Sequence, residues 1–223
     1  MAGDTERPTI RVAMTGGEVV TKDIEDYVSG VVLAEVYATW PVDVLKAQAV
    51  AARTYALAET KHHKEGFDVC TSPGCCQAYT NKRAMRVDAA VAATMGVVLV
   101  DQDSRQVFKS YYSASCGGST VDIWDPAHLR AMECPCGLHG HSVKGHRHGF
   151  CQWGAYYLVV DRQYDWRSIL MHYYKADFDN KYGQAEEEPP STIEERVTAI
   201  EKWIAGLEEY HYGGRAFLVK AGG

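Results

Sequence analysis

The chain has 223 residues, of which 46% are hydrophobic and 23% are charged, enough for one large domain, alone or with an appendage. Its net charge of −6 argues against a generic nucleic-acid binder, because such proteins carry a basic surface. No apolar run is long enough to span a membrane, and residues 1–17 lack the charged-then-apolar pattern of a secretory signal. The protein is therefore expected to be cytosolic, or exported by means of a leader that this sequence does not include.

The first part of the chain predicts two strands followed by two helices. Residues 8–20 have the pattern of a strand, a Gly-Gly turn and a second strand. Residues 24–57 predict two helices that are interrupted just before Pro41. Asp23 or Thr21 can cap the first helix, and Pro41 suits the first turn of the second, where its missing N–H costs nothing. The many small residues of the second helix imply close packing.

The middle of the chain alternates loops with regular elements. We expect a His/Cys-rich loop at 61–82, a helix at 86–95, a hairpin at 96–115, an irregular segment at 117–150, and helices at 151–160 and 165–174. Together these elements predict an α+β fold over residues 1–185. In this fold a helical pair packs on a twisted antiparallel sheet, and Cys/His-rich loops line a groove.

The tail differs in composition from the rest. Residues 185–190 (AEEEPP) suggest a linker, and Ser191 with Glu194 forms a capping-box pattern. Apolar residues at 193, 197, 200, 204 and 207 keep helical spacing. Residues 186–223 are therefore expected to be an amphipathic helical appendage, ending in a short strand or a loose end over 213–223. Such a helix packs on its own domain or pairs with a second copy, which makes a homodimer possible.

One carboxylate, Glu35, lies on an otherwise apolar helical stripe. It shares a face with Val28, Val31 and Val32, so burial is expected to favour its neutral form. It also lies near the C-terminal end of its helix, where the dipole disfavours negative charge. Both effects raise a carboxyl pKa, as a general acid at neutral pH requires. The alternative is that Glu35 reaches solvent or pairs with a base such as Arg53.

Four segments stand out by their content and their order. They are AEVYATWPVDVLKAQAVAARTYA (34–56), DVCTSPGCCQAYT (68–80), YYSASCGGST with Trp124 downstream (111–124), and GHRHGFCQWGAYYL (145–158). This ordered set resembles the SpoIID/LytB family, the stage II sporulation protein D-like peptidoglycan lytic transglycosylases and amidase enhancers. The resemblance runs from about residue 8 to 175 and does not cover the tail.

The resemblance implies a lytic transglycosylase that cleaves glycan strands, preferably stripped of stem peptides, between N-acetylmuramic acid and N-acetylglucosamine. The product ends in a 1,6-anhydro sugar, because the muramyl C6 hydroxyl attacks in place of water. Glu35 takes the position of the family's catalytic acid. The family motif also implies a polar saccharide-binding lining, formed here by Arg53, Gln77, Ser113, His148 and Gln152.

Two of these assignments carry open points. The segment HGFCQWGA resembles the family's HGVGMSQYGA but departs from it in length at Phe150-Cys151, which leaves the role of Gln152 open. Arg53 can instead form a structural salt bridge, with Glu35 or Asp26 as its partner.

The seven cysteines all lie in the middle of the chain, and their clustering suits local metal sites or local crosslinks. Some family members carry zinc on one His and two Cys near the Q-A-Y segment. This implies Cys70 and Cys76 with His63, or alternatively His62, as zinc ligands here. The fourth ligand is left open between Cys75, a water and Glu35.

A second cysteine group surrounds Pro135. Cys134 and Cys136, with several histidines nearby, offer a second metal site, and a disulfide from either to Cys116 or Cys151 is equally plausible in an exported protein. The sequence does not choose between these alternatives.

The resemblance leaves two functions open. The first is the lytic transglycosylase, acting outside the cytoplasm on the cell wall or in a forespore-facing compartment, with glycan strands and other cell-wall hydrolases as partners. The second is a non-catalytic glycan-binding enhancer of a cell-wall amidase. A zinc or cysteine hydrolase is disfavoured, because the chain has no H-E-x-x-H motif and no recognisable catalytic Cys/His pair.

Overall fold

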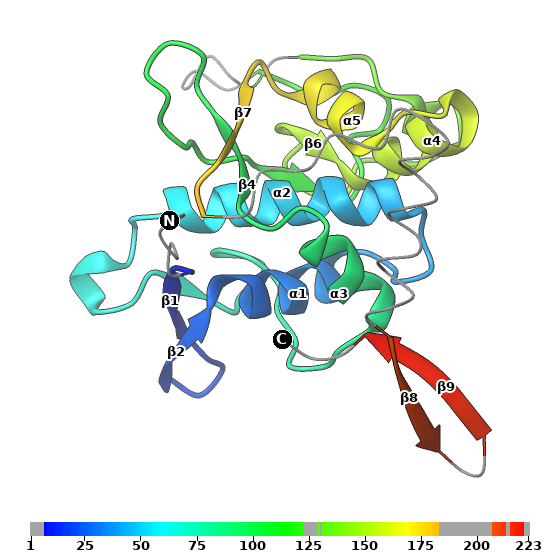
Figure 1. Ribbon diagram of the computed structural model, residues 1–223. Coiled ribbons are helices and arrows are strands. Elements are labelled where there is room, and N and C mark those ends of the chain that lie inside the picture. Colours follow the sequence, from blue (N-terminus) through cyan, green and yellow to red (C-terminus); the bar gives the residue numbers. More distant parts are fainter. Residues whose placement is uncertain (1–6, 123–128, 130, 183–206, 213–214, 221–223) are drawn as a thin grey trace. The chain divides into compact units, whose positions relative to one another are not determined.

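The computed structural model describes residues 7–122, 129, 131–182, 207–212 and 215–220 (Figure 1). Contacts divide the chain into two units, residues 1–184 and 185–223, and each is described by itself. Among the described residues, no helix combines the length and apolar character that crossing a bilayer requires.

The predicted strand–turn–strand at the start of the chain is confirmed. Strands β1 (Thr9–Ala13) and β2 (Val19–Asp23) pair antiparallel, with Thr9 opposite Asp23. Gly16 and Gly17 in the turn between them both have positive φ, which glycine adopts without strain. A third short strand, β3 (Val69–Cys70), joins β1 in parallel.

Two helices follow, as the apolar pattern predicted. The side chain of Asp23 caps helix α1 (Ile24–Glu35) by accepting the backbone N–H groups of Glu25 at 2.8 Å and Asp26 at 3.3 Å. Helix α2 (Val42–Ala58) begins after Pro41, which stands at the N-cap, one position earlier than expected. The residue before a proline is biased away from helical backbone, so the chain turns between α1 and α2.

Helix α2 lies at the centre of the first unit. Figure 1 shows α1 and α3 (Met85–Ala92) on one side of it and α4 (Gln152–Arg162) and α5 (Trp166–Tyr173) on the other. Every residue of α2 from 47 to 56 is buried, in agreement with its small side chains. Ala-rich faces let neighbouring helices approach closely on several sides.

The prediction of a hairpin over 96–115 is wrong. Strand β4 (Val97–Val100) pairs antiparallel with β7 (Asp177–Asn180), and only a single bridge links Val100 to Val107. After the turn, the chain leaves β4 and packs onto α2, where Ser110 Oγ donates to the carbonyl of Ala51 at 2.7 Å. This anchor takes the expected second hairpin strand away from the first.

The remaining elements are short. They are the 3₁₀ turns η1 (His63–Glu65) and η2 (Pro135–Gly137) and the strands β5 (Tyr112–Ser113) and β6 (Phe150–Cys151). Strands β5 and β6 pair in parallel. The α+β class is confirmed, but the strands form several small sheets, two of them with a parallel pairing, rather than one antiparallel sheet.

The second unit contains a hairpin. Strands β8 (Leu207–Tyr212) and β9 (Arg215–Lys220) pair antiparallel. The helix predicted from residue 193 lies outside the described residues, except that Leu207 begins β8. The description of 186–223 as helical is therefore corrected for 207–212 and 215–220, whereas the expected short final strand coincides with β9.

Candidate functional site

Glu35 is the last residue of α1, and its half-buried carboxylate is held by two donors. The backbone N–H of Ala78 donates to Oε1 at 2.8 Å, and Nε2 of Gln152 donates to Oε2 at 3.3 Å. Burial raises the pKa of Glu35, and these two hydrogen bonds lower it without cancelling that effect. The direction is the one expected from the sequence, while the catalytic role stays a prediction.

Gln77 directly precedes Ala78, whose N–H donates to Glu35, and is held in place by buried hydrogen bonds. Its Oε1 accepts from the hydroxyl of Tyr27 at 3.0 Å, and its Nε2 donates to the hydroxyl of Tyr112 at 2.7 Å. The side chain is only 1% exposed, so it does not occupy the accessible, saccharide-facing place that was expected. Its buried hydrogen bonds instead fix the segment that carries the N–H of Ala78.

Gln152 lies beside Glu35, and the saccharide-binding role that the resemblance implied for it stays a prediction. Besides its bond to Glu35, its Nε2 donates to Oε1 of Gln48 at 3.3 Å. Gln48 is fully buried, and its own Nε2 has no hydrogen-bond partner among the residues that the structure describes. The amide of Gln152, from α4, therefore links the carboxylate of Glu35 to the amide of Gln48, from α2.

Ser113 and His148 are not joined to Glu35 by any hydrogen bond of the described residues. Ser113 Oγ is buried directly under Gly145 and finds no hydrogen-bond partner within the described part of the chain. The ring of His148 stacks on that of His146 with centroids 5.1 Å apart. Their expected saccharide contacts remain predictions, and Trp124, near them in the sequence motif, lies outside the described residues.

Arg53 is not part of an accessible surface, which corrects its predicted binding role. Its guanidinium is completely buried and pairs with Glu25, through Nε–Oε1 at 2.9 Å and Nη2–Oε2 at 2.5 Å. Nη1 also donates to the carbonyl of Val97 at 3.0 Å. The partner is neither Glu35 nor Asp26. The available signal was that Glu25 precedes Val28 by three residues and so lies on the same apolar stripe.

The first Cys/His group contains His62 rather than His63. The Sγ atoms of Cys70 and Cys76 are 3.6 Å apart, and Nε2 of His62 is 3.2 Å from Sγ of Cys75. The ligand atoms of these four residues all lie within 4.8 Å of one another. Thiolates and one imidazole form a donor set that suits tetrahedral zinc.

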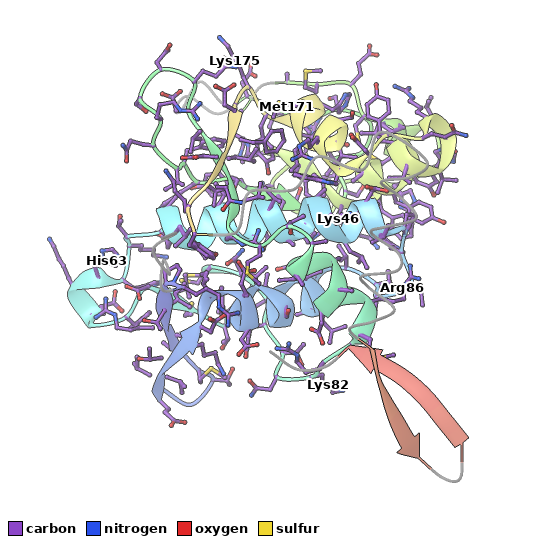
Figure 2. All side chains as sticks on the ribbon, viewed as in Figure 1. Lys46, His63, Lys82, Arg86, Met171 and Lys175 are labelled. Atoms are coloured by element: carbon purple, nitrogen blue, oxygen red, sulfur yellow. The ribbon has the colours of Figure 1, made fainter. Side chains whose placement is uncertain are left out.

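His63 is excluded from this group by its direction. It lies on the loop between α2 and β3, where its ring contacts Asp68 at 3.4 Å and is 49% exposed (Figure 2). His62 is buried, and its Nδ1 faces Glu65 at 3.1 Å, which leaves Nε2 turned towards the sulfurs. A carboxylate on the second ring nitrogen is the usual support of a metal-binding histidine.

Cys75, one of the alternatives left open for the fourth ligand, belongs to the same group. Burial raises the pKa of its thiol, but hydrogen bonds from Lys61 and His62 outweigh burial and lower it to about 7. Lys61 Nζ lies 3.2 Å from the sulfur. The thiolate that a metal needs is thus accessible near neutral pH.

The second cysteine group is Cys116, Cys134, Cys136 and Cys151, all of them buried and within 4.8 Å of one another at sulfur. The histidines considered as its ligands point elsewhere. His139 pairs with Asp161 at 2.7 Å, and the ring of His141 stacks on Trp153 with centroids 4.2 Å apart.

An aromatic surface starts immediately beside Glu35, and sequence analysis missed it. Tyr37 is 65% exposed, and its ring lies 6.5 Å from that of the half-buried Trp153. Trp40 contacts Trp153 with ring centroids at 4.8 Å. Aromatic residues at 153, 156 and 157, spaced along one helical face, were the available signal. Flat apolar rings with polar edges suit the faces of sugar rings.

The described residues thus combine a half-buried acid of raised pKa with an aromatic surface and two cysteine groups that could hold metal, on an α+β scaffold. Comparison with known proteins adds the family. Residues 14–100 match the sequence model of SpoIID, described as a stage II sporulation protein. This match contains Glu35 and the first Cys/His group, and over these residues it confirms the resemblance. The match suggests a cell-wall related role.

A relative in the spirochaete Brachyspira hyodysenteriae (strain ATCC 49526 / WA1) is described as an uncharacterized protein. It is 42% identical over 102 residues, which are 44% of this chain and 27% of that protein. The match therefore spans about a quarter of the relative, and its description assigns no activity.

Proposed function

We propose that this protein is a peptidoglycan lytic transglycosylase with Glu35 as its general acid and base. The observation that carries the proposal is the half-buried Glu35, with its raised pKa and two hydrogen-bond donors, in the segment that matches SpoIID. The substrate is the bond between N-acetylmuramic acid and N-acetylglucosamine in glycan strands, preferably free of stem peptides.

The reaction requires one proton to be given and one to be taken. Protonated Glu35 donates its proton to the bridging oxygen while the bond from that oxygen to the muramyl C1 breaks. The resulting carboxylate then accepts the proton of the muramyl C6 hydroxyl as its oxygen forms the new bond to C1. No water adds, and the sugar closes to the 1,6-anhydro product. Ordinary glycosidases need a second carboxylate as nucleophile or base, which this internal attack replaces.

The surroundings of Glu35 suit both halves of this cycle. Burial favours the neutral acid that donates the proton. The N–H of Ala78 and the amide of Gln152 favour the carboxylate that remains afterwards. Opposing influences of this kind keep a single carboxyl able to act first as acid and then as base.

Binding of the strand is assigned to the aromatic surface. Tyr37 lies two residues after Glu35, and Trp153 lies one residue after Gln152. A sugar ring stacked on the exposed ring of Tyr37 would lie near the carboxyl, while His141 already covers one face of Trp153. The partners and compartment proposed with this function are glycan strands and other cell-wall hydrolases outside the cytoplasm, and a homodimer through the tail.

The first Cys/His group has a supporting role in this proposal. His62, Cys70, Cys75 and Cys76 would hold zinc, whose contribution when bound is to fix the fold of their loop. Cys76 is two residues from Ala78, so an ordered loop keeps the N–H of Ala78 aimed at Glu35.

The test compares the wild type with Glu35→Gln and with Glu18→Gln, whose carboxyl is exposed. Each protein is incubated with peptide-free glycan strands, and the products are analysed by mass spectrometry. Anhydro ends from the wild type and Glu18→Gln, and none from Glu35→Gln, support the proposal. Strand binding without cleavage supports the amidase enhancer instead. Products that contain added water, or full-rate cleavage by Glu35→Gln, overturn the mechanism.

A further inference from the structure

The second cysteine group has the dimensions of a mononuclear metal site. Sγ of Cys136 lies 3.5 Å from that of Cys116 and 3.4 Å from that of Cys134. A disulfide holds its sulfurs at ~2.05 Å, whereas four sulfurs placed ~2.3 Å from one tetrahedral ion lie ~3.8 Å from each other. The 4.8 Å limit on all pairs leaves no room for the sulfides of a multi-iron cluster between the thiols.

Three separate segments bring these cysteines together. Cys116 follows β5, Cys134 and Cys136 flank the first residue of η2, and Cys151 ends β6 and caps α4. The loops after Cys116 and Cys136 approach so closely that a Cβ on Gly137 would lie 2.6 Å from the Cα of Gly118. A set of ligands from distant positions that converges on one small volume is typical of structural metal sites.

Hydrogen-bond donors face the sulfur atoms. The backbone N–H of Gly154, in the first turn of α4, donates to Sγ of Cys151 at 3.3 Å. The hydroxyl of Tyr173 lies 3.2 Å from Sγ of Cys134, and Ser115 Oγ donates to Sγ of Cys136 at 3.7 Å. Donors of this kind support metal-bound thiolates.

Burial then determines what must neutralise such thiolates. All four cysteines are at most 5% exposed, and buried anions are costly unless a cation pairs with them. The donors that face the sulfurs, the N–H of Gly154 and the hydroxyls of Tyr173 and Ser115, are neutral and do not supply such a charge.

We propose that Cys116, Cys134, Cys136 and Cys151 bind one zinc ion as a closed, structural S₄ site. All four positions are filled by protein ligands, so the ion has no open position for substrate or water. Cys151 immediately precedes Gln152, and the bound ion therefore fixes the start of α4 and the amide that donates to Glu35. This site is separate from the first Cys/His group and does not depend on the proposed glycan cleavage.

The experiment measures zinc in the full chain, purified under reducing conditions without added metal. Plasma mass spectrometry is applied to the wild type, to Cys70→Ser and to the double variant Cys70→Ser/Cys136→Ser. We expect Cys70→Ser to retain one tightly held zinc ion per chain and the double variant to have lost that ion. Cys70→Ser is the matched control, because it alters one thiol of the first group and leaves the second intact.

A second measurement avoids the risk that the double variant does not fold. X-ray absorption at the zinc edge of Cys70→Ser is expected to show four sulfur neighbours at ~2.3 Å. Nitrogen or oxygen neighbours there would overturn the assignment. So would iron in place of zinc, or a zinc-free protein whose intact mass, after alkylation, shows disulfides among these four cysteines.

Discussion

Replacing Arg53 by methionine is expected to destabilise the first unit by breaking a buried ion pair. The guanidinium is completely buried and makes two contacts to Glu25, at 2.9 and 2.5 Å. Methionine fills similar space but leaves the carboxylate of Glu25 with only the N–H of Gly96 at 3.1 Å and the hydroxyl of Tyr182 at 2.7 Å. Removing one partner of a buried pair costs ~3–5 kcal/mol.

The size of this effect makes it measurable. For a domain of this length each kcal/mol shifts the unfolding midpoint by ~2–4 °C, so Arg53→Met should melt ~6–20 °C lower than the wild type. Urea titration followed by tryptophan fluorescence under reducing conditions gives the free energy directly. The matched control is Arg83→Met, whose half-exposed pair with Asp26 at 2.9 Å should contribute less than ~1 kcal/mol.

The same experiment separates the two interpretations of Arg53. If it is structural, the double variant Glu25→Met/Arg53→Met should recover part of the lost stability, because no unpaired charge remains buried. A different outcome would refute the reasoning: an Arg53→Met protein as stable as the wild type that no longer binds glycan strands. That result would return Arg53 to the saccharide-binding role that the family motif implied.

Four further predictions concern the proposed site and the tail. Glu35→Gln should lower the cleavage rate ~10²–10⁴-fold with an unchanged circular dichroism spectrum, measured from the yield of anhydro ends. Because the pKa of Glu35 is raised, the folded protein holds this proton more tightly than the unfolded chain does. This carboxyl should therefore make the free energy of unfolding fall as the pH rises from the ordinary pKa of 4.5 through the raised value. Glu35→Gln should lack this component in urea titrations carried out across pH. Tyr37→Ala should weaken glycan binding ~3–10-fold in calorimetry without lowering the melting temperature, since its ring is 65% exposed. Removing residues 186–223 should convert a dimer into a monomer in sedimentation, and a full chain that is already monomeric would contradict the dimer.

Local patterns in the sequence were sufficient for the elements that depend on near neighbours. The cap at Asp23, the interruption before Pro41 and the apolar stripe that carries Glu35 all follow from residues a few positions apart. The burial of Glu35 could be expected for the same reason, because its helical neighbours at i−3, i−4 and i−7 are apolar.

Long-range pairing was beyond the reach of these patterns. Strand β4 pairs with β7, about 80 residues later, and the ion pair of Arg53 with Glu25 depends on how two helices lie against each other. The choice between His62 and His63 depended on the course of one loop, since adjacent residues point in different directions there.

Cys151, Gln152 and Trp153 are consecutive, yet they serve the sulfur cluster, the acid and the aromatic surface in turn. Successive residues in a helix point about 100° apart, so the first turn of α4 sends these neighbours in separate directions. Inserting or deleting one residue at this junction would rotate all three away from their partners together.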